Sequence, residues 1–434
     1  MIEIMPFDDG ASLHNVGRLI TDLKPRRNMF VDTLMNRIAF TIITSKVWDN
    51  PYAPVFNRGR LEFGESIEEA FVDLARPFDF NPDRAEKTLF RREFPDVRVT
   101  FYRLNWQKFY KQTVSYEQLR TAFLSWAGVS DLVSGIIRAM YKSMSYDRFI
   151  ATKYVLCRAI LNGAAGGIKV EGFTSASEQG ELMGTIRGLS NDLTFLKPDY
   201  NAAGVYNDTS RGQQYLFMDT FLSGKIDVNV LAAAFHMDKA DFAGHLLLID
   251  GFDRHDTARL NLLFGDDENY VPFTAAELTT LSGIGAVLVD RLFISIWDIL
   301  QEMDEVRNGE GLYWNYVLHN WACIAVNPFA NAVVITKDTF TVTDLTIVYA
   351  DGEDLPQELT IAKGGSIELT AEVDGTGTFN RAVRWELTGA QESGTYIMGG
   401  TLRVATNETA TKLTIKAVSL SDSTVEDSVT ITVQ

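Results

Sequence analysis

The chain has 434 residues, 46% hydrophobic and 11% aromatic, with a formal net charge of −17. This length exceeds one ordinary hydrophobic core and predicts two or three domains. The acidic balance disfavours a sequence-specific reader of DNA or RNA, which presents a basic surface. No run of 18 apolar residues occurs, so no transmembrane helix is predicted. Acidic residues near the N-terminus argue against a signal peptide.

The charge is unevenly distributed along the chain. Residues 11–112 hold 17 Lys and Arg against 13 Asp and Glu, which is +4. Residues 1–10 carry −3, and residues 113–337 and 338–434 carry −9 each. Two interpretations stay open: the basic segment of one molecule lies on the acidic body of another, or both are solvated surfaces.

The first 45 residues show weak periodicity and contain the basic cluster Lys24-Pro25-Arg26-Arg27, which indicates an arm with a short helix over 28–37. In the next segment, Ser66 and Glu69 form a capping box, which predicts a helix start. Asn81-Pro82 predicts another helix start before residues 83–92.

Two strands are predicted at the end of this basic segment. Val97, Val99 and Phe101 alternate with polar residues, which is typical of a strand. A second strand near 109–114 is predicted to pair with it as a long hairpin. Ser115 with Gln118 is another capping box and predicts a helix that ends at Trp126.

A long helix is predicted over 130–162, after an interruption at Gly128. It has no proline and one internal glycine. Leu132, Ile136, Ile137, Met140 and Met144 form one apolar stripe. About 33 residues at 1.5 Å each give roughly 50 Å of helix, long enough to act as the spine of a large body.

Residues 168–320 are predicted to form mixed α and β structure. Strands are predicted at 246–249, 287–289, 313–326 and 332–335, and a helix at 228–235. A linker is predicted near 336–344.

The last 90 residues follow a period of two, which predicts strands with one buried and one solvated face. The predicted strands cover 366–373, 383–387, 413–417 and 429–433. Strands of this kind, separated by Gly, Asp, Asn and Ser turns, predict an antiparallel sandwich, and Trp385 is the candidate core residue of an immunoglobulin-like fold.

No catalytic, cofactor-binding or metal site is predicted. Gly283-Ile284-Gly285 lacks the third glycine of a dinucleotide fingerprint, and the five histidines lack zinc spacing. The acidic stretches 253–256 and 266–269 lack the spacing of a calcium loop and are interpreted as solvated. Cys157 and Cys323 are interpreted as free, buried thiols, which fits a cytoplasmic folding compartment.

Ten short blocks along the chain resemble one protein family. They read LEFGESIEE at 61–69, FRREFPDV at 90–97, FYKQT at 109–113, LRTAFLSW at 119–126, DVNVLAAAFHM at 227–237, IDGF at 249–252, AVLVD at 286–290, VRN at 306–308, GLYWNY at 311–316 and FANAV at 329–333. In this order they are similar to the major capsid proteins of small, short-tailed Bacillus phages with protein-primed genomes. A terminal immunoglobulin-like module of the bacterial group-two type is part of the resemblance.

The resemblance implies an α+β fold of the Hong Kong 97 type followed by an all-β immunoglobulin-like sandwich. The expected parts are an N-terminal arm (1–45), an extended loop (46–112), a peripheral domain with the spine helix (113–167), an axial domain (168–310), returning peripheral strands and linker (311–343), and the immunoglobulin-like domain (344–434).

The function implied is self-assembly into the pentamers and hexamers of an icosahedral or prolate phage head. The expected partners are further copies of the chain, a scaffolding protein, the portal or connector, and packaged double-stranded DNA bound without sequence specificity. No membrane partner, cofactor or enzymatic activity is expected. The expected location is the virion capsid, assembled in the host cytoplasm.

Six arginines are the candidate inter-subunit contacts, because they lie in the basic segment: Arg26, Arg27, Arg58, Arg60, Arg91 and Arg92. Two other classes stay open from the sequence. One is a cell-surface or secreted adhesin that uses the immunoglobulin-like module, and the other is a tail or neck component of the same virion.

Overall fold

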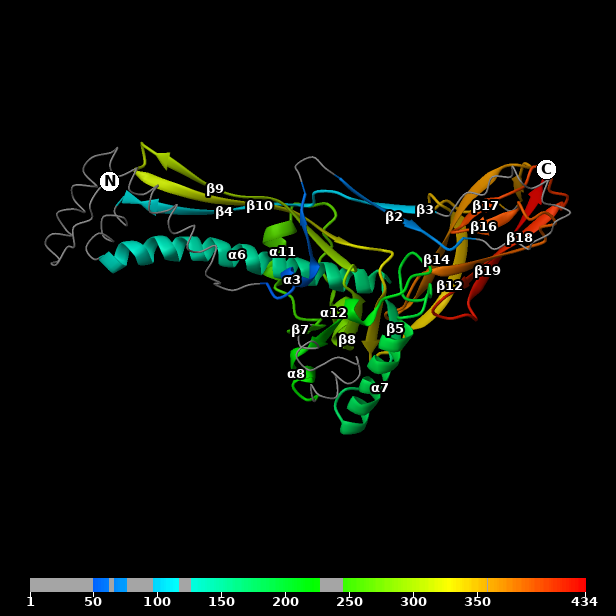
Figure 1. The fold of residues 1–434 in the computed structure, drawn as a ribbon, viewed down its shortest axis with the longest axis horizontal. Helices are drawn as coiled ribbons and strands as arrows, with labels where there is room; N and C mark the ends of the chain where they lie inside the picture. Colours follow the sequence, from blue (N-terminus) through cyan, green and yellow to red (C-terminus); the bar gives the residue numbers. More distant parts are fainter. Residues whose placement is uncertain (1–49, 62–65, 76–96, 117–125, 227–244, 357) are drawn as a thin grey trace.

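The computed structural model describes residues 50–61, 66–75, 97–116, 126–226, 245–356 and 358–434. This part of the protein is elongated and mixed α/β. A long helix and a long hairpin form one end, a central sheet carries helices on both faces, and two further sheets form the C-terminal end (Figure 1). Within these ranges, no helix is long and apolar enough to cross a membrane.

The long helix α6 (Trp126–Leu161) has 36 residues. Ile137, Met140 and Met144, spaced three and four residues apart, are buried as predicted. The predicted interruption at Gly128 is wrong, since α6 runs through it. One glycine costs a helix about 1 kcal/mol, which packing along the rest of a long helix offsets.

A four-stranded sheet lies along α6, in the order β1-β9-β10-β4. Its strands are β1 (Asn57–Arg60), β9 (Ile294–Asn308), β10 (Tyr313–Val326) and β4 (Trp106–Ser115). Alternate residues of β10, among them Trp314, Tyr316 and Leu318, are buried, so the sheet has one face in the core. The predicted strand at 313–326 is confirmed.

The central sheet has the order β5-β11-β8-β6-β7. Its strands are β5 (Gly166–Lys169), β11 (Ala332–Thr336), β8 (Ile284–Asp290), β6 (Gln214–Asp219) and β7 (Leu246–Ile249). All seven residues of β8 are buried. The predicted strands at 246–249, 287–289 and 332–335 are confirmed, whereas the predicted helix at 228–235 lies outside the described residues.

Helices cover both faces of this sheet. On one face α7 (Ala176–Asp192) packs through Leu182, Ile186 and Leu189. On the other face lie the second half of α6, α11 (Thr257–Phe264) and α12 (Ala275–Ser282). The short α-helices α3 (Ala53–Phe56) and α8 (Thr220–Ser223) and the 3₁₀ helix η2 (Arg211–Gln213) complete the described helices. Both cysteines are buried and unpaired, as predicted.

A separate two-stranded ribbon consists of β2 (Ile67–Val72) and β3 (Val97–Tyr102). The strand predicted from Val97, Val99 and Phe101 is confirmed. The helix start predicted from Ser66 and Glu69 is wrong, because residues 67–72 pair with β3 along their whole length. Pairing of the ribbon and packing of its inner face here override the local capping signal.

The predicted hairpin between β3 and residues 109–114 is also wrong in its pairing. Residues 109–114 do form a strand, β4, but it pairs antiparallel with β10. Asn105, just before β4, donates from Nδ2 to the Ile324 carbonyl (2.7 Å) and accepts from the Ile324 amide (2.9 Å). These bonds direct β4 along β10 instead of back along β3.

The C-terminal part consists of two four-stranded sheets around one core. The first contains β12 (Thr341–Tyr349), β14 (Ser366–Thr376), β17 (Thr401–Arg403) and β16 (Tyr396–Met398); the second contains β13 (Leu359–Ile361), β19 (Glu426–Val433), β18 (Lys412–Ser419) and β15 (Val383–Thr388). The four predicted strands are confirmed. Trp385 packs against this core but is only partly buried.

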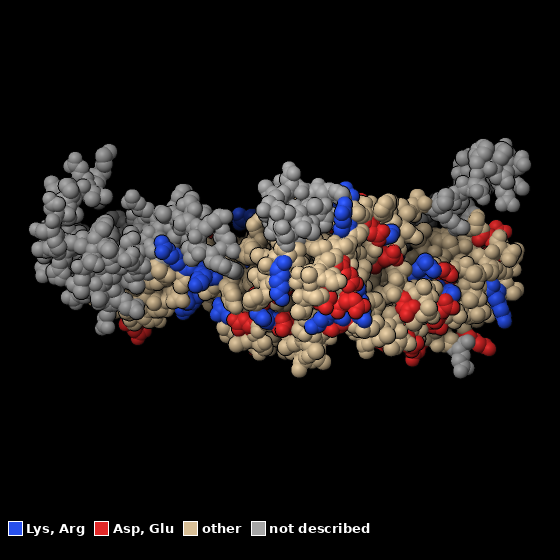
Figure 2. Space-filling model, turned by 90° about the horizontal axis from the view of Figure 1, so that it is seen from below, with Lys and Arg blue, Asp and Glu red and all other residues tan. Residues whose placement is uncertain are grey.

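Charged side chains of both signs are interspersed on the face shown in Figure 2. The largest groups of acidic side chains lie over the middle of the molecule and the C-terminal sheets. The net charge of −17 makes separate molecules repel each other at low salt, so association between copies must rely on other contacts.

Candidate inter-subunit interface

The β2–β3 ribbon divides its side chains between an inner and an outer face. Phe71 pairs with Arg98 and Ile67 with Tyr102 on the inner face. An isolated two-stranded ribbon is at best marginally stable in water, so its inner face must be held by the rest of the protein.

Glu69 is the polar anchor of the inner face. Its carboxylate accepts from the Tyr102 hydroxyl (2.9 Å) and from Nδ2 of Asn327 (2.7 Å). Burial, together with this hydrogen bond to Glu69, raises the pKa of the Tyr102 phenol, so Tyr102 stays a neutral donor at ordinary pH.

Aromatic packing adds to this anchor. The Phe71 ring stacks on Phe329 with a centroid distance of 5.5 Å, and the Tyr102 ring lies 5.1 Å from Trp297. Pairs at these distances stabilise by about 0.5–1.5 kcal/mol each. The ribbon is therefore attached to the body through β9 and the segment before β11.

Arg98 ties the far end of the ribbon to two other segments. Its guanidinium donates to the carbonyl of Ala203, and its Nη2 lies 2.7 Å from the position that a Cβ would take at Gly399. Gly399 has φ +57° and belongs to the turn between β16 and β17. The C-terminal sheets thus lie against the ribbon of their own chain.

The outer face of the ribbon is exposed and mostly apolar; besides four large apolar side chains it carries Ala70 and the carboxylate of Glu68. The exposed fractions are 59% for Val72, 47% for Val97, 40% for Val99 and 60% for Phe101. Val97, Val99 and Phe101 follow one another along β3, and Val72 pairs with Val97 across the ribbon. Four large apolar side chains grouped on a ribbon that is anchored from behind are typical of a protein interaction surface. We refer to these four residues as the outer ribbon face.

The body behind the ribbon is braced by ion pairs from α6. Asp147, fully buried, receives two hydrogen bonds from Arg259 at 2.7 and 2.9 Å. Lys153, 2% exposed, donates to Asp250 at 2.5 Å and to the Arg254 carbonyl. Both pairs tie α6 to the segments around α11, which makes this region a rigid support.

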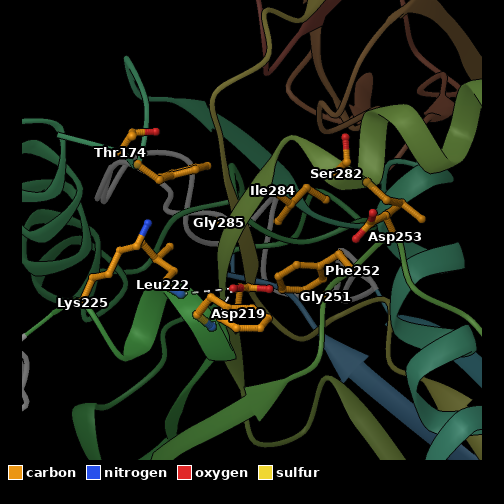
Figure 3. A pocket seen from close by; sticks show the side chains of 13 residues that line it. Thr174, Asp219, Leu222, Lys225, Gly251, Phe252, Asp253, Ser282, Ile284 and Gly285 are labelled. Atoms are coloured by element: carbon orange, nitrogen blue, oxygen red, sulfur yellow. Dashed lines mark hydrogen bonds between the residues drawn. The ribbon is translucent and has the colours of Figure 1, made fainter.

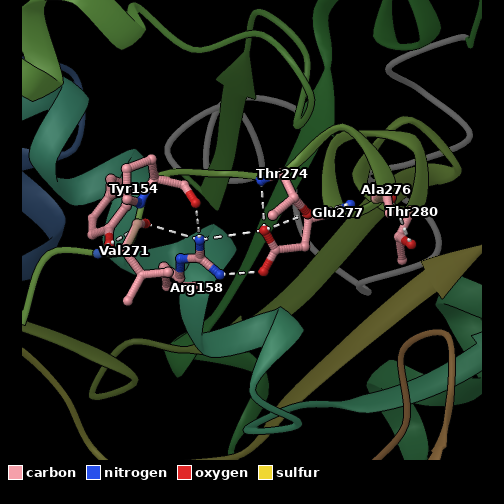
Figure 4. A network of polar contacts seen from close by, with 8 residues as sticks. Tyr154, Arg158, Val271, Thr274, Ala276, Glu277 and Thr280 are labelled. Atoms are coloured by element: carbon pink, nitrogen blue, oxygen red, sulfur yellow. Dashed lines mark hydrogen bonds and ion pairs between the residues drawn. The ribbon is translucent and has the colours of Figure 1, made fainter.

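A third brace involves Arg158, near the end of α6 (Figure 4). Its Nη2 donates to the carbonyls of Val271 and Pro272, each at 2.9 Å, and its Nη1 contacts Glu277. Glu277 also accepts from the Thr274 amide at 2.7 Å, closing the capping box of α12. Burial raises the pKa of Glu277, but the hydrogen bonds from Arg158 and Thr274 have the larger combined effect, so its pKa is lowered.

Two of the six predicted contact arginines lie among the described residues. Arg58 is partly buried and donates within its own chain, to Ser295 Oγ at 3.3 Å and to the Arg291 carbonyl, so it fastens β1 to the turn before β9. Burial first, and then the charge of Arg291, lower its pKa. Arg60 is exposed. Arg26, Arg27, Arg91 and Arg92 lie outside the described residues.

A pocket of about 210 Å³ lies between α8, the start of β8 and the loop 251–253 (Figure 3). Asp219 lines it but is engaged as the cap of α8, accepting from the Phe221 amide at 2.9 Å. Ser282 donates to the Thr279 carbonyl at 2.7 Å. The side chains that line this pocket do not pair a nucleophile with a base.

In the part of the chain that the structure describes, no group of three His, Cys, Asp or Glu could hold a metal ion.

Comparison with solved structures defines the class of the protein. The capsid protein in the capsid structure of Staphylococcus phage Andhra superposes with a TM-score of 0.52 at 15% identity, covering 67% of this chain and 85% of that one. The fold is therefore that of phage capsid proteins of the Hong Kong 97 type.

The sequence comparisons give the family. Residues 4–336 match the Phi29-like phage major capsid protein family. The major capsid protein of Bacillus phage B103 is 31% identical over 417 residues, 95% of this chain and 85% of the relative. That of Streptococcus phage Cp-1 is 24% identical and covers 75% of this chain. The chain belongs to the Phi29-like phage major capsid proteins, a structural family of the virion capsid.

The sequence predicts the strand that carries Val97, Val99 and Phe101 but does not identify the outer ribbon face as a contact surface. Residues 97–102 alternate between apolar and polar side chains, whereas residues 67–72 do not, and the capping pattern at Ser66 and Glu69 favours a helix there. The prediction from charge alone also pointed to arginines, whereas the described surface that is most suited to association is apolar.

Proposed function

We propose that this capsid protein assembles into pentamers and hexamers that form an icosahedral or prolate head around double-stranded DNA. The single observation that carries the proposal is the outer ribbon face, a group of four exposed apolar side chains on an element that contacts with the rest of the chain hold in place. Family membership supplies the context.

The parts of the chain take the following roles in the proposal. Residues 1–45 form an arm and 46–112 an extended loop that reach neighbouring subunits. Residues 113–167 and 311–343 form the peripheral domain and linker, and 168–310 the axial domain at the capsomer centre. The location of the β2–β3 ribbon within 46–112 supports the assignment of the extended loop.

The outer ribbon face is the proposed contact to a neighbouring copy. Fully burying one Val or Phe contributes about 1.5–3 kcal/mol, so four half-exposed side chains contribute several kcal/mol per contact. Repeated over a closed shell, such contacts outweigh the repulsion between subunits of net charge −17.

Residues 344–434 form an immunoglobulin-like domain in this proposal, on the outer surface or bridging capsomers. Two four-stranded sheets around one core support it. β12 begins at Thr341, ahead of the boundary expected from the sequence.

A scaffolding protein and a portal are the proposed partners during assembly in the host cytoplasm. The acidic character of the chain suits a container whose wall does not bind the packaged DNA. The protein then acts without catalysis. The adhesin alternative finds no support in the family match.

The proposal is tested with a double variant, Val99→Ser with Phe101→Ser. We expect it to fold like the parent chain, because both side chains are exposed, and to lose shell formation in electron micrographs and sedimentation velocity. Phe195→Ser is the control, since Phe195 is 63% exposed and belongs to the segment after α7, not to the ribbon. Shells at parental yield from the double variant would overturn the role of the ribbon.

A further inference from the structure

A second pocket, of about 240 Å³, lies between α6, the start of β4 and the loop after α11. Four of its lining residues are aromatic: Trp106, Tyr154, Phe264 and Tyr270. A cavity of about 150 Å³ accommodates benzene, whereas sites for drug-sized ligands begin near 300 Å³. The pocket therefore fits one side chain of a protein partner.

The rings form a connected cluster. The centroid distances are 5.7 Å for Trp106 and Phe264, 5.4 Å for Tyr154 and Tyr270, and 5.8 Å for Phe264 and Tyr270. A cluster of aromatic rings around one small volume attracts organic cations through the negative charge of the ring faces.

Each polar ring is fixed by a hydrogen bond. Trp106 donates to Asn320 Oδ1 at 2.9 Å, Tyr154 to the Val271 carbonyl at 3.0 Å, and Tyr270 to Asn261 Oδ1 at 3.0 Å. Since the rings are already held in place, a bound group does not have to order them.

The surroundings of the pocket favour positive charge. Lys108 Nζ is 5.4 Å from the Phe264 centroid and Arg158 Cζ is 6.0 Å from that of Tyr154, so two of the rings already contact a cation of the same chain. The positive charge of a ligand is therefore balanced by acidic groups at the rim. The loop 266–268 at the rim carries three exposed carboxylates. Among the described residues, no Lys or Arg forms an ion pair with them.

We propose that this pocket receives the guanidinium group of Arg26 or Arg27 from a second copy of the chain. Residues 24–27 hold three cations in four positions, and residues 11–112 are net basic while the rest of the chain is acidic. A flat guanidinium stacks on aromatic faces and is weakly hydrated, so it suits an aromatic pocket better than an ammonium does. The inference rests on the proposed self-assembly, and it names one contact of that assembly.

The first test uses the unmodified protein. Shells are assembled from a mixture of light and ¹⁵N-labelled chains and treated with a carbodiimide, which joins Lys24 to a nearby carboxylate as an amide and takes up the released water. We expect Lys24 to be joined to residues 266–268, in peptide pairs that combine a light with a heavy chain. Coupling of Lys24 to other carboxylates alone, or within one chain alone, would overturn the proposal.

The second test does not depend on shells. A labelled peptide of residues 18–32 is titrated onto the disassembled full chain, with an Arg26→Gln, Arg27→Gln peptide as its control. We expect binding of the first peptide and an affinity about tenfold lower with Tyr270→Leu. Tyr206→Leu, at a 43% exposed tyrosine outside the pocket, should leave it unchanged.

The two tests separate the pocket from the proposed function. Equal binding of the two peptides, or an unchanged affinity with Tyr270→Leu, contradicts the pocket even if shells form normally. Peptide binding by a chain that never forms shells would support the pocket and contradict the assembly proposal instead.

Discussion

Gly167 in β5 lies directly against the backbone carbonyl of Thr378, just after β14. A Cβ at position 167 would overlap that carbonyl oxygen. Close by, Nδ2 of Asn380 donates to the carbonyls of Asp199 (2.8 Å) and Asn201 (3.2 Å). The C-terminal sheets are therefore seated on the edge of the central sheet through backbone contacts.

Gly167→Ala should lower the free energy of unfolding by about 1–3 kcal/mol, because backbone on both sides of the contact must move. Thermal unfolding of the full chain measures the change. Gly180→Ala, in α7 with open space around its Cα, should instead be neutral or slightly stabilising. Equal stability of the parent and Gly167→Ala would show that the close contact between Gly167 and Thr378 does not contribute to the stability of the fold.

Arg158→Lys should cost about 1–3 kcal/mol, because a lysine cannot contact Glu277 and the carbonyls of Val271 and Pro272 together. Chemical denaturation measures this difference. Arg187→Lys, at an exposed position of α7, is the control and should change little. A parental midpoint for Arg158→Lys would contradict the bracing role assigned to this side chain.

Glu408 gives the C-terminal sheets a defined pH dependence. Burial alone would raise its pKa, but bonds from the Thr395 hydroxyl and from the amides of Ala410, Gln391 and Glu392 lower it to about 2. A depressed pKa stabilises the folded state above the usual carboxyl range, and this contribution is lost as pH falls from about 4.5 toward 2.

The Glu408→Gln variant should therefore melt lower than the parent at pH 7, with a difference that shrinks as the pH approaches 2. Calorimetry of the full chain at several pH values measures it. Glu372→Gln, on the exposed side of β14, serves as the control. A difference that grows at low pH would contradict the assigned role of Glu408.

Arg26→Glu together with Arg27→Glu should impair shell formation and leave the chain folded, because the proposal places these arginines on the acidic body of a neighbouring copy. Lys412→Glu changes an exposed charge in β18 and should have a smaller effect. Sedimentation velocity measures the fraction assembled. Normal assembly of the double variant would contradict a role of Arg26 and Arg27 in contacts between copies.

The sequence predicts those elements whose burial pattern is local. The long helix shows its stripe of Ile137, Met140 and Met144, and β10 shows its alternation, so both were predictable. The pairing of β4 with β10 was not, because it depends on Asn105 contacting Ile324 across more than two hundred residues of chain. For the same reason, the capping pattern at Ser66 wrongly predicts a helix: residues 67–72 form a strand because they pair with residues 97–102.

Electron microscopy of the purified chain, with sedimentation velocity on the same sample, tests the central claim most directly. The account predicts closed shells or rings of five and six subunits. It also predicts a yield that rises from low to moderate salt, as the screening length shortens to about 8–10 Å and repulsion between subunits of charge −17 weakens. A monomer at all salt concentrations, even with a scaffolding protein added, would contradict it.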